Sequence, residues 1–353
     1  MGIISNIFRF YAILYYTKPM AELIPLPTEM YKSKLPFPSF PSGHRAIDWA
    51  IHRLPDLEKG TEILNSVIEA AREHHTKIIV LSPHEDDVPL SVGGLVTEFP
   101  PKNVYTITFF TRALQSAQTS DLKRYVAPGF SSVVELYEKR HEEDVQSNMT
   151  LGIPRDNQYH LGFIDAPWRT KANSNTHVYP FRESQFGRVA GYDRQTLMPQ
   201  LQERLREHIR TIVGDSENFL IFAPAALGMT KLHLRPVDHT IIRDVAAAAF
   251  PADSMRDHVL YYGEYPYLSE GVPDKKLIKP GVLPALHAVP NQDNKHKAVL
   301  CHQSQVSRLF DPRSSLSVGA MPHAFPPEMM FVTEKNLQTI TKSTPVTYYG
   351  SSK

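Results

Sequence analysis

Short apolar runs, several rich in β-branched residues, alternate with longer segments of helical periodicity through most of this 353-residue chain. Several of these runs end in turn residues, which is typical of strands buried on both faces of a sheet. The predicted strands are residues 77–82, 104–110, 158–164, 219–224, 258–265 and a short one within 328–334. The predicted helices are residues 57–75, 132–153, 195–213, 237–250 and 294–310. This alternation predicts an α/β fold, a Rossmann-like mostly parallel sheet with helices on both faces.

The chain divides into three predicted parts. Residues 1–75 form an N-terminal extension, residues 76–310 the α/β domain, and residues 311–353 a C-terminal tail that packs on the domain. Within the extension, the apolar and aromatic residues 1–16 predict a packing helix, with a membrane-surface or partner-binding helix as the alternative. The proline-rich residues 20–45 predict an extended segment that wraps a surface.

Composition narrows the classes of function. The formal net charge is +1 and no long basic run is present, which argues against a nucleic-acid partner. The single cysteine, Cys301, excludes an internal disulfide and a cysteine-rich zinc site, and it fits a reducing cytosol. The N-terminal apolar stretch is interrupted by Arg9 and is too short to span a bilayer. We therefore expect a cytoplasmic protein without an integral membrane span, and its oligomeric state stays open.

Charged residues gather at predicted strand ends. His84, Asp86 and Asp87 directly follow the strand at residues 77–82, and His239 follows the fourth strand. Because ligands bind at the carboxyl ends of parallel strands, these side chains are candidates for one site. Two histidines and a carboxylate are a common catalytic zinc set, and Asp86 beside them could act as general base. His and Asp also serve as turn and cap residues, so the pattern alone is weak.

Several short motifs, taken in order, resemble the PIG-L/LmbE-like family of zinc-dependent N-acetylglucosaminyl deacetylases. The stretch "SPHEDDVPLSVGG" is similar to the family's His-Pro-Asp-Asp motif, and "YEKRHEEDVQSNMTLGI" matches a helical Arg-x-x-Glu through Arg140 and Glu143. "HLGFID" matches a strand that ends at Asp165, and "RPVDH" supplies Asp238 and His239. The late stretch "KHKAVLCHQSQV" also resembles a family helix. The resemblance runs over residues 76–310.

The resemblance implies a zinc-dependent hydrolase that removes an N-acetyl group from an amino sugar or amino-sugar conjugate. Its implied metal ligands are His84, Asp87 and His239, with one Zn²⁺ per chain. Asp86 would be the general base for the attack of zinc-bound water on the amide. The implied partner is a small-molecule or glycoconjugate substrate.

The remaining implied roles concern the substrate and the histidines. Arg140 and Asp165 would contact sugar hydroxyls, although an ordinary i,i+3 pair on the helix and a loop cap are the plain alternatives for Arg140 and Asp165. Arg169 is a further sugar-binding candidate by position. Asp238 would orient a histidine, as carboxylates behind metal ligands do.

Two positions depart from the family pattern. The family's proline is Glu85 here, which we expect to lie outside the chemistry. The family histidine three residues before the final ligand is Pro236 here. His233, or alternatively Arg235, is predicted to stabilise the oxyanion in its place. This departure keeps two other functions open: a non-catalytic sugar or metabolite-binding protein of the same fold, and a same-fold hydrolase of a non-sugar amide.

Overall fold

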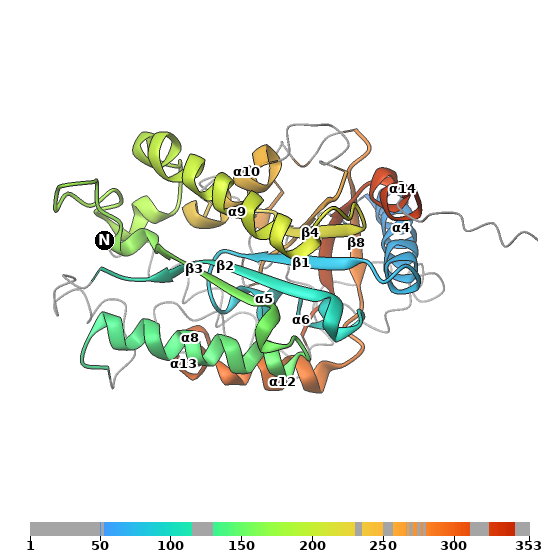
Figure 1. The fold of residues 1–353 in the computed structure, drawn as a ribbon, viewed down its shortest axis with the longest axis horizontal. Coiled ribbons are helices and arrows are strands. Elements are labelled where there is room, and N and C mark those ends of the chain that lie inside the picture. The colour runs from blue at the N-terminus through green and yellow to red at the C-terminus, as the bar shows by residue number, and fades with distance from the viewer. Residues whose placement is uncertain are drawn as a thin grey trace, which may run out of the picture.

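A computed structural model gives the fold of the chain (Figure 1). It describes residues 53–114, 130–229, 235–249, 257–265, 280–310 and 325–342, together with Ala50, Tyr267, Leu277 and residues 271–273. The predicted helix at residues 1–16, the proline-rich segment at 20–45 and His233 lie outside the described residues. Within the described part of the chain, no helix is both long and apolar enough to cross a membrane.

A mixed sheet forms the centre of the molecule. Its seven strands are β1 (Lys77–Ser82), β2 (Val104–Arg112), β3 (Gln158–Ile164), β4 (Phe219–Pro224), β6 (Val259–Tyr262), β8 (Leu283–His287) and β9 (Glu328–Val332). Their order across the sheet is β3-β2-β1-β4-β6-β9-β8. The pairs from β3 to β6 are parallel, whereas β9 runs antiparallel to both β6 and β8. The predicted α/β class with a mostly parallel sheet is confirmed.

Helices cover both faces of this sheet (Figure 1). Helices α9 (Met198–Val213) and α10 (Val237–Ala249) lie on one face. Helices α8 (Val133–Thr150), α12 (Gln292–Cys301) and α13 (Gln303–Leu309) lie on the other. Helices α4 (Leu54–Glu73) and α14 (Glu334–Lys342) lie beside β8 and β9. Two short helices, α5 (Asp87–Ser91) and α6 (Gly93–Val96), follow β1 directly.

The apolar run of β1 is continuous because both of its faces are buried. Ile78 and Val80 belong to a core shared with α4, α5 and α6, whereas Ile79 and Leu81 belong to a second core shared with α9 and α10. Alternate residues of a strand point to opposite faces, so a strand between two helical layers has no polar side. This burial leaves only the end of β1 available for polar residues.

Several predicted elements differ in extent. Strand β8 was not predicted, because Pro284 and Pro290 make residues 283–290 read as a loop, and proline in sheets is confined to edge positions such as this one. The predicted helix at 294–310 breaks at His302, whose φ of −82° and ψ of 58° are not helical. Strand β9 and helix α14, from the predicted tail, and α4, from the predicted extension, all pack into the core. The division at residues 75 and 310 stays a prediction.

Gly60 allows α4 to approach β8 closely. A Cβ atom at this position would lie 2.1 Å from the carbonyl oxygen of Pro284. We expect Gly60→Ala to lower the free energy of unfolding by about 1–3 kcal/mol, because backbone must move to relieve the clash, and this exceeds the gain of about 1 kcal/mol in helix propensity. Denaturant unfolding measures the change. Gly191→Ala is the control, since nothing lies within 4 Å of its Cβ position, and equal midpoints for the two variants would contradict the prediction.

Candidate active site

The loop after β1 brings three of the predicted site residues to the carboxyl end of the sheet. His84, Glu85 and Asp86 form this loop, and Asp87 begins α5. The backbone N–H of His84 donates to Asp87 Oδ2 at 2.8 Å, which fixes the carboxylate against its own loop. His239 enters from the first turn of α10, which follows β4 in the chain. The site is therefore built from the ends of two adjacent parallel strands.

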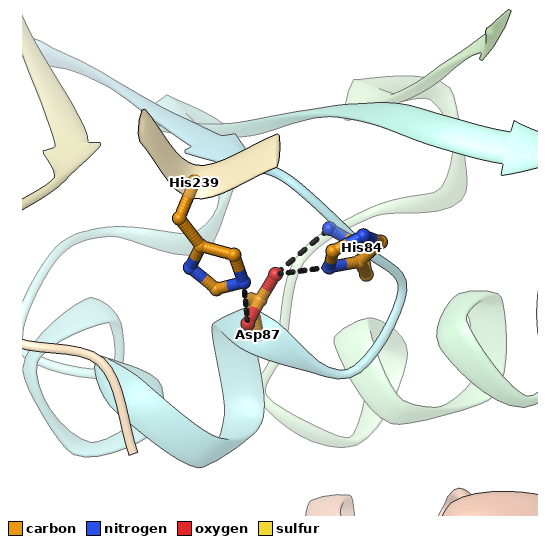
Figure 2. A group of neighbouring side chains, drawn as sticks. All are labelled: His84, Asp87 and His239. Atoms are coloured by element: carbon orange, nitrogen blue, oxygen red, sulfur yellow. Dashed lines mark hydrogen bonds and ion pairs between the residues drawn. The ribbon is translucent and has the colours of Figure 1, made fainter. Parts of the chain in front are cut away.

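His84, Asp87 and His239 converge on one point (Figure 2). Asp87 Oδ2 lies 3.5 Å from His84 Nδ1, and Asp87 Oδ1 lies 3.6 Å from His239 Nε2. One ligand atom from each residue lies within 4.8 Å of the others, and Asp87 and His239 are buried. Two imidazole nitrogens and a carboxylate form a donor set suited to Zn²⁺, so these three residues could hold a metal ion.

Glu264 contacts the ring nitrogen of His239 that points away from Asp87. It follows β6, and its Oε1 lies 3.2 Å from His239 Nδ1 and accepts the N–H of Ala226 at 2.7 Å. A carboxylate on Nδ1 fixes the imidazole tautomer and leaves Nε2 free to coordinate. Sequence reasoning missed Glu264, because a single glutamate after a strand forms no motif. Its position at the end of β6 was the available signal.

Asp165 and Asp238 lie on the far side of His84. Asp165 Oδ1 and Asp238 Oδ2 each lie 3.4 Å from His84 Nε2. Asp165 Oδ2 also accepts the hydroxyl of Tyr137 at 2.5 Å. These carboxylates orient the His84 ring so that Nδ1 faces Asp87. Asp238, predicted to orient a histidine, lies against His84, and its orienting role stays a prediction.

His84, Asp165 and Asp238 form a second group close enough to share an ion. Arg169 argues against that use, because its guanidinium donates to Asp238 Oδ1 at 2.6 Å and neutralises the carboxylate. Arg169 also pairs with Asp193 at 2.5 Å and is 5% exposed. This predicted sugar-binding candidate is therefore a buried residue whose guanidinium pairs with two carboxylates of the protein. The group with Asp87 is the better fit for a metal.

Electrostatics favour a cation at this point. Burial alone would lower the pKa of His84, but Asp165, Asp238 and Asp87 raise it well above its usual value. Burial likewise opposes charge on Asp87, yet His239 and His84 hold the pKa of its carboxyl below the usual range. The carboxylates around the two imidazoles therefore favour positive charge at this point.

Glu85 is a buried carboxyl group directly before Asp86. It is completely buried, and Arg140 Nη2 lies 3.1 Å from its Oε2 and 3.7 Å from Asp86 Oδ1. Burial raises the pKa of Glu85 to about 7, although Arg140 acts in the opposite direction. The expectation that this position lies outside the chemistry stays a prediction, and the structure pairs Glu85 with Arg140.

The buried face of α8 is polar from Arg140 onward. It carries Arg140, Glu143, Asp144, Ser147 and Asn148, all buried. Arg140 pairs with Glu85, and Glu143 accepts the backbone N–H and hydroxyl of Ser304. The pair Arg140 and Glu143 is thus not an i,i+3 ion pair. The helix instead ties the β1 loop to the start of α13.

Most predicted site residues gather in this region. Asp165 and Asp238 contact His84, Asp86 precedes Asp87 in the chain, and Arg140 lies 3.7 Å from Asp86. Arg140 and Asp165 are 7% and 8% exposed and are paired with protein groups. His233, predicted to stabilise the oxyanion, lies outside the described residues.

Comparisons with known proteins reveal relatives by structure. No family model matches the chain, and no curated protein matches its sequence. The structure is similar to the A40926 pseudoaglycone deacetylase Dbv21, at 21% identity and a TM-score of 0.50 over 73% of this chain and 96% of that one. It is also similar to the zinc-inhibited form of teicoplanin deacetylase Orf2, at 20% identity and a TM-score of 0.52 over 72% and 97%. At these identities the likeness establishes a shared α/β fold.

Proposed function

We propose that this protein is a metal-dependent hydrolase that removes an N-acyl group from an amino sugar or amino-sugar conjugate. N-acetyl is the acyl group that we propose. The observation that carries the proposal is the convergence of His84, Asp87 and His239 at the end of β1, where Asp86 directly precedes Asp87. The shared fold with the A40926 pseudoaglycone deacetylase and the teicoplanin deacetylase supports it.

The donor set fits one Zn²⁺ held by His84, Asp87 and His239. When bound, the ion would polarise the amide carbonyl and make water more acidic. Glu264 and Asp238 keep the two imidazoles in the tautomers that this requires.

Asp86 is the proposed general base. Its carboxylate takes a proton from the attacking water and returns it to the departing nitrogen, so that the C–N bond breaks to give a free amine and a carboxylic acid. The positively charged guanidinium of Arg140 lies 3.7 Å from Asp86 Oδ1. Arg140 and Asp165 are also our candidates for contacts with the sugar, and His233 or Arg235 for the oxyanion.

The test is amine release from N-acetylglucosamine and its glycosides, with primary amine and acetate measured in parallel. The expected result is release of both in equal amounts. Binding of the sugars without release would favour the non-catalytic binding protein. Release from simple N-acetyl amines but not from sugars would favour the same-fold hydrolase of a non-sugar amide.

A further inference from the structure

A buried histidine of the helical layer lines the same hollow as the proposed base. His302 lies at the break between α12 and α13 and is 2% exposed. Neither of its ring nitrogens has a hydrogen-bond partner in the described part of the chain, and the same holds for Gln305 Nε2. Buried polar groups are nearly always paired, so these three orphaned atoms require an explanation.

His302, Gln305 and Asp86 line one narrow hollow. Its other walls are apolar, formed by Leu90, Val299, Val306, Leu309 and Phe310. The apolar residues offer no side-chain hydrogen-bonding group, so the side-chain partners that this hollow offers to its polar groups are one another. Burial lowers the pKa of His302, so its ring is neutral and carries one donor and one acceptor.

The backbone around His302 is held firmly. Its carbonyl accepts the N–H groups of Gln305 at 2.9 Å and of Val306 at 2.8 Å. The adjacent Ser304 is anchored to α8, because its N–H donates to Glu143 at 3.1 Å and its hydroxyl at 2.5 Å. The imidazole is therefore presented to the hollow by a fixed turn.

Three carboxylates and one cation act on the imidazole: Asp144, Asp86, Glu143 and Arg140. Two of the carboxylates already have donors. Asp144 pairs with His160 at 2.7 Å and Asn148 at 3.0 Å, and Glu143 accepts from Ser304. Among the described residues, the Asp86 carboxylate accepts no hydrogen bond, since Arg140 stands at 3.7 Å. Asp86 is thus the remaining acceptor for the His302 N–H.

We propose that His302 is a positioning residue for Asp86: rotation of these side chains within the hollow lets its ring N–H donate to the Asp86 carboxylate and lets Gln305 Nε2 donate to its other ring nitrogen. This chain of two hydrogen bonds satisfies all three orphaned atoms and fixes the His302 tautomer. It aims the lone pairs of Asp86 at the attacking water. The inference rests on the proposed function of Asp86 as general base.

The first experiment measures the kinetics of His302→Leu, which removes both ring nitrogens. We expect kcat to fall about 10- to 100-fold, the range typical of groups that orient catalytic side chains, with KM within about twofold. His302→Asn or His302→Gln, which keep one N–H, should restore part of the rate. In the Asp86→Asn background, His302→Leu should cause no further loss, because its effect passes through Asp86.

His287→Leu is the matched control. His287 is also buried, at 9% exposure, with an unpartnered Nε2 and a pKa lowered by burial, but it lies on β8 outside the hollow. An equal loss of kcat in this variant, or additive losses in the double variant of Asp86 and His302, would overturn the positioning role.

A spectroscopic measurement tests the hydrogen bond between His302 and Asp86 independently of enzyme activity. In protein labelled with ¹⁵N-histidine, the His302 N–H should give a slowly exchanging resonance that is absent in His302→Leu and shifted in Asp86→Asn. No such resonance, or one indifferent to Asp86→Asn, would overturn the inference. If the resonance behaves as expected but the wild-type protein releases no amine, only the proposed function fails.

Discussion

Asp86→Asn should lower kcat for amine release by about 10³-fold, within the range that general acid–base catalysis contributes, while the metal stays bound. The substituted amide keeps the size of the side chain but cannot accept the proton of water. Asp86 is not one of the three residues that converge as a metal group, so the metal content should match that of the wild type. Steady-state kinetics and elemental analysis of the same preparation measure both quantities.

The control for this substitution is Asp215→Asn. Asp215 is an exposed aspartate after α9, so the same chemical change is made far from the site. Its kcat should equal that of the wild type. An Asp86→Asn enzyme that keeps more than about a tenth of the wild-type kcat would contradict the role of Asp86 as general base.

Lys295→Met should lower the free energy of unfolding by about 3–5 kcal/mol, because it leaves a buried carboxylate without its cation. Lys295 Nζ lies 2.5 Å from Glu328 Oε1, and the two residues are 2% and 1% exposed. Glu328 also accepts the backbone N–H groups of Gly94 at 2.7 Å and of Leu95 at 2.6 Å. The pair thus joins α12, β9 and α6, and its loss is expected to weaken the whole helical layer.

A second variant separates lost charge balance from lost packing. In the double variant of Lys295→Met and Glu328→Gln, no uncompensated charge remains, so stability should recover in part. Lys59→Met removes the exposed pair with Glu334 and should leave the unfolding midpoint unchanged. Denaturant unfolding compares the variants, and equal midpoints for Lys295→Met and Lys59→Met would contradict the importance of the buried pair.

The fold was predictable where burial dictates the sequence. Strand β1, with Ile78 to Leu81 buried on both faces, could be read directly from its apolar run. Strand β8 could not, since Pro284 and Pro290 give it the local chemistry of a loop. Its pairing with β9 comes from tertiary packing against α4, where Gly60 meets Pro284, and no local pattern encodes that contact.

The site shows the same division. The charged residues His84, Asp86 and Asp87 stood out because they follow a buried strand in a stretch that resembles a family motif. The contacts of Glu264 and Glu85 could not be predicted from the sequence. Glu264 contacts His239 and Glu85 pairs with Arg140, and each partner is distant in sequence. The burial of the polar residues on α8 could not be predicted either. Their partners lie on the β1 loop, β3 and α13, which come together only in the folded protein.

The central claim is that His84, Asp87 and His239 hold a metal ion on which amide hydrolysis depends. Elemental analysis of purified wild type and His239→Ala, combined with amine release from N-acetylglucosamine conjugates, tests it most directly. The account predicts about one zinc per chain in the wild type and loss of both zinc and amine release in His239→Ala. A wild-type protein that binds no zinc after reconstitution, or a His239→Ala protein that keeps both zinc and activity, would contradict it.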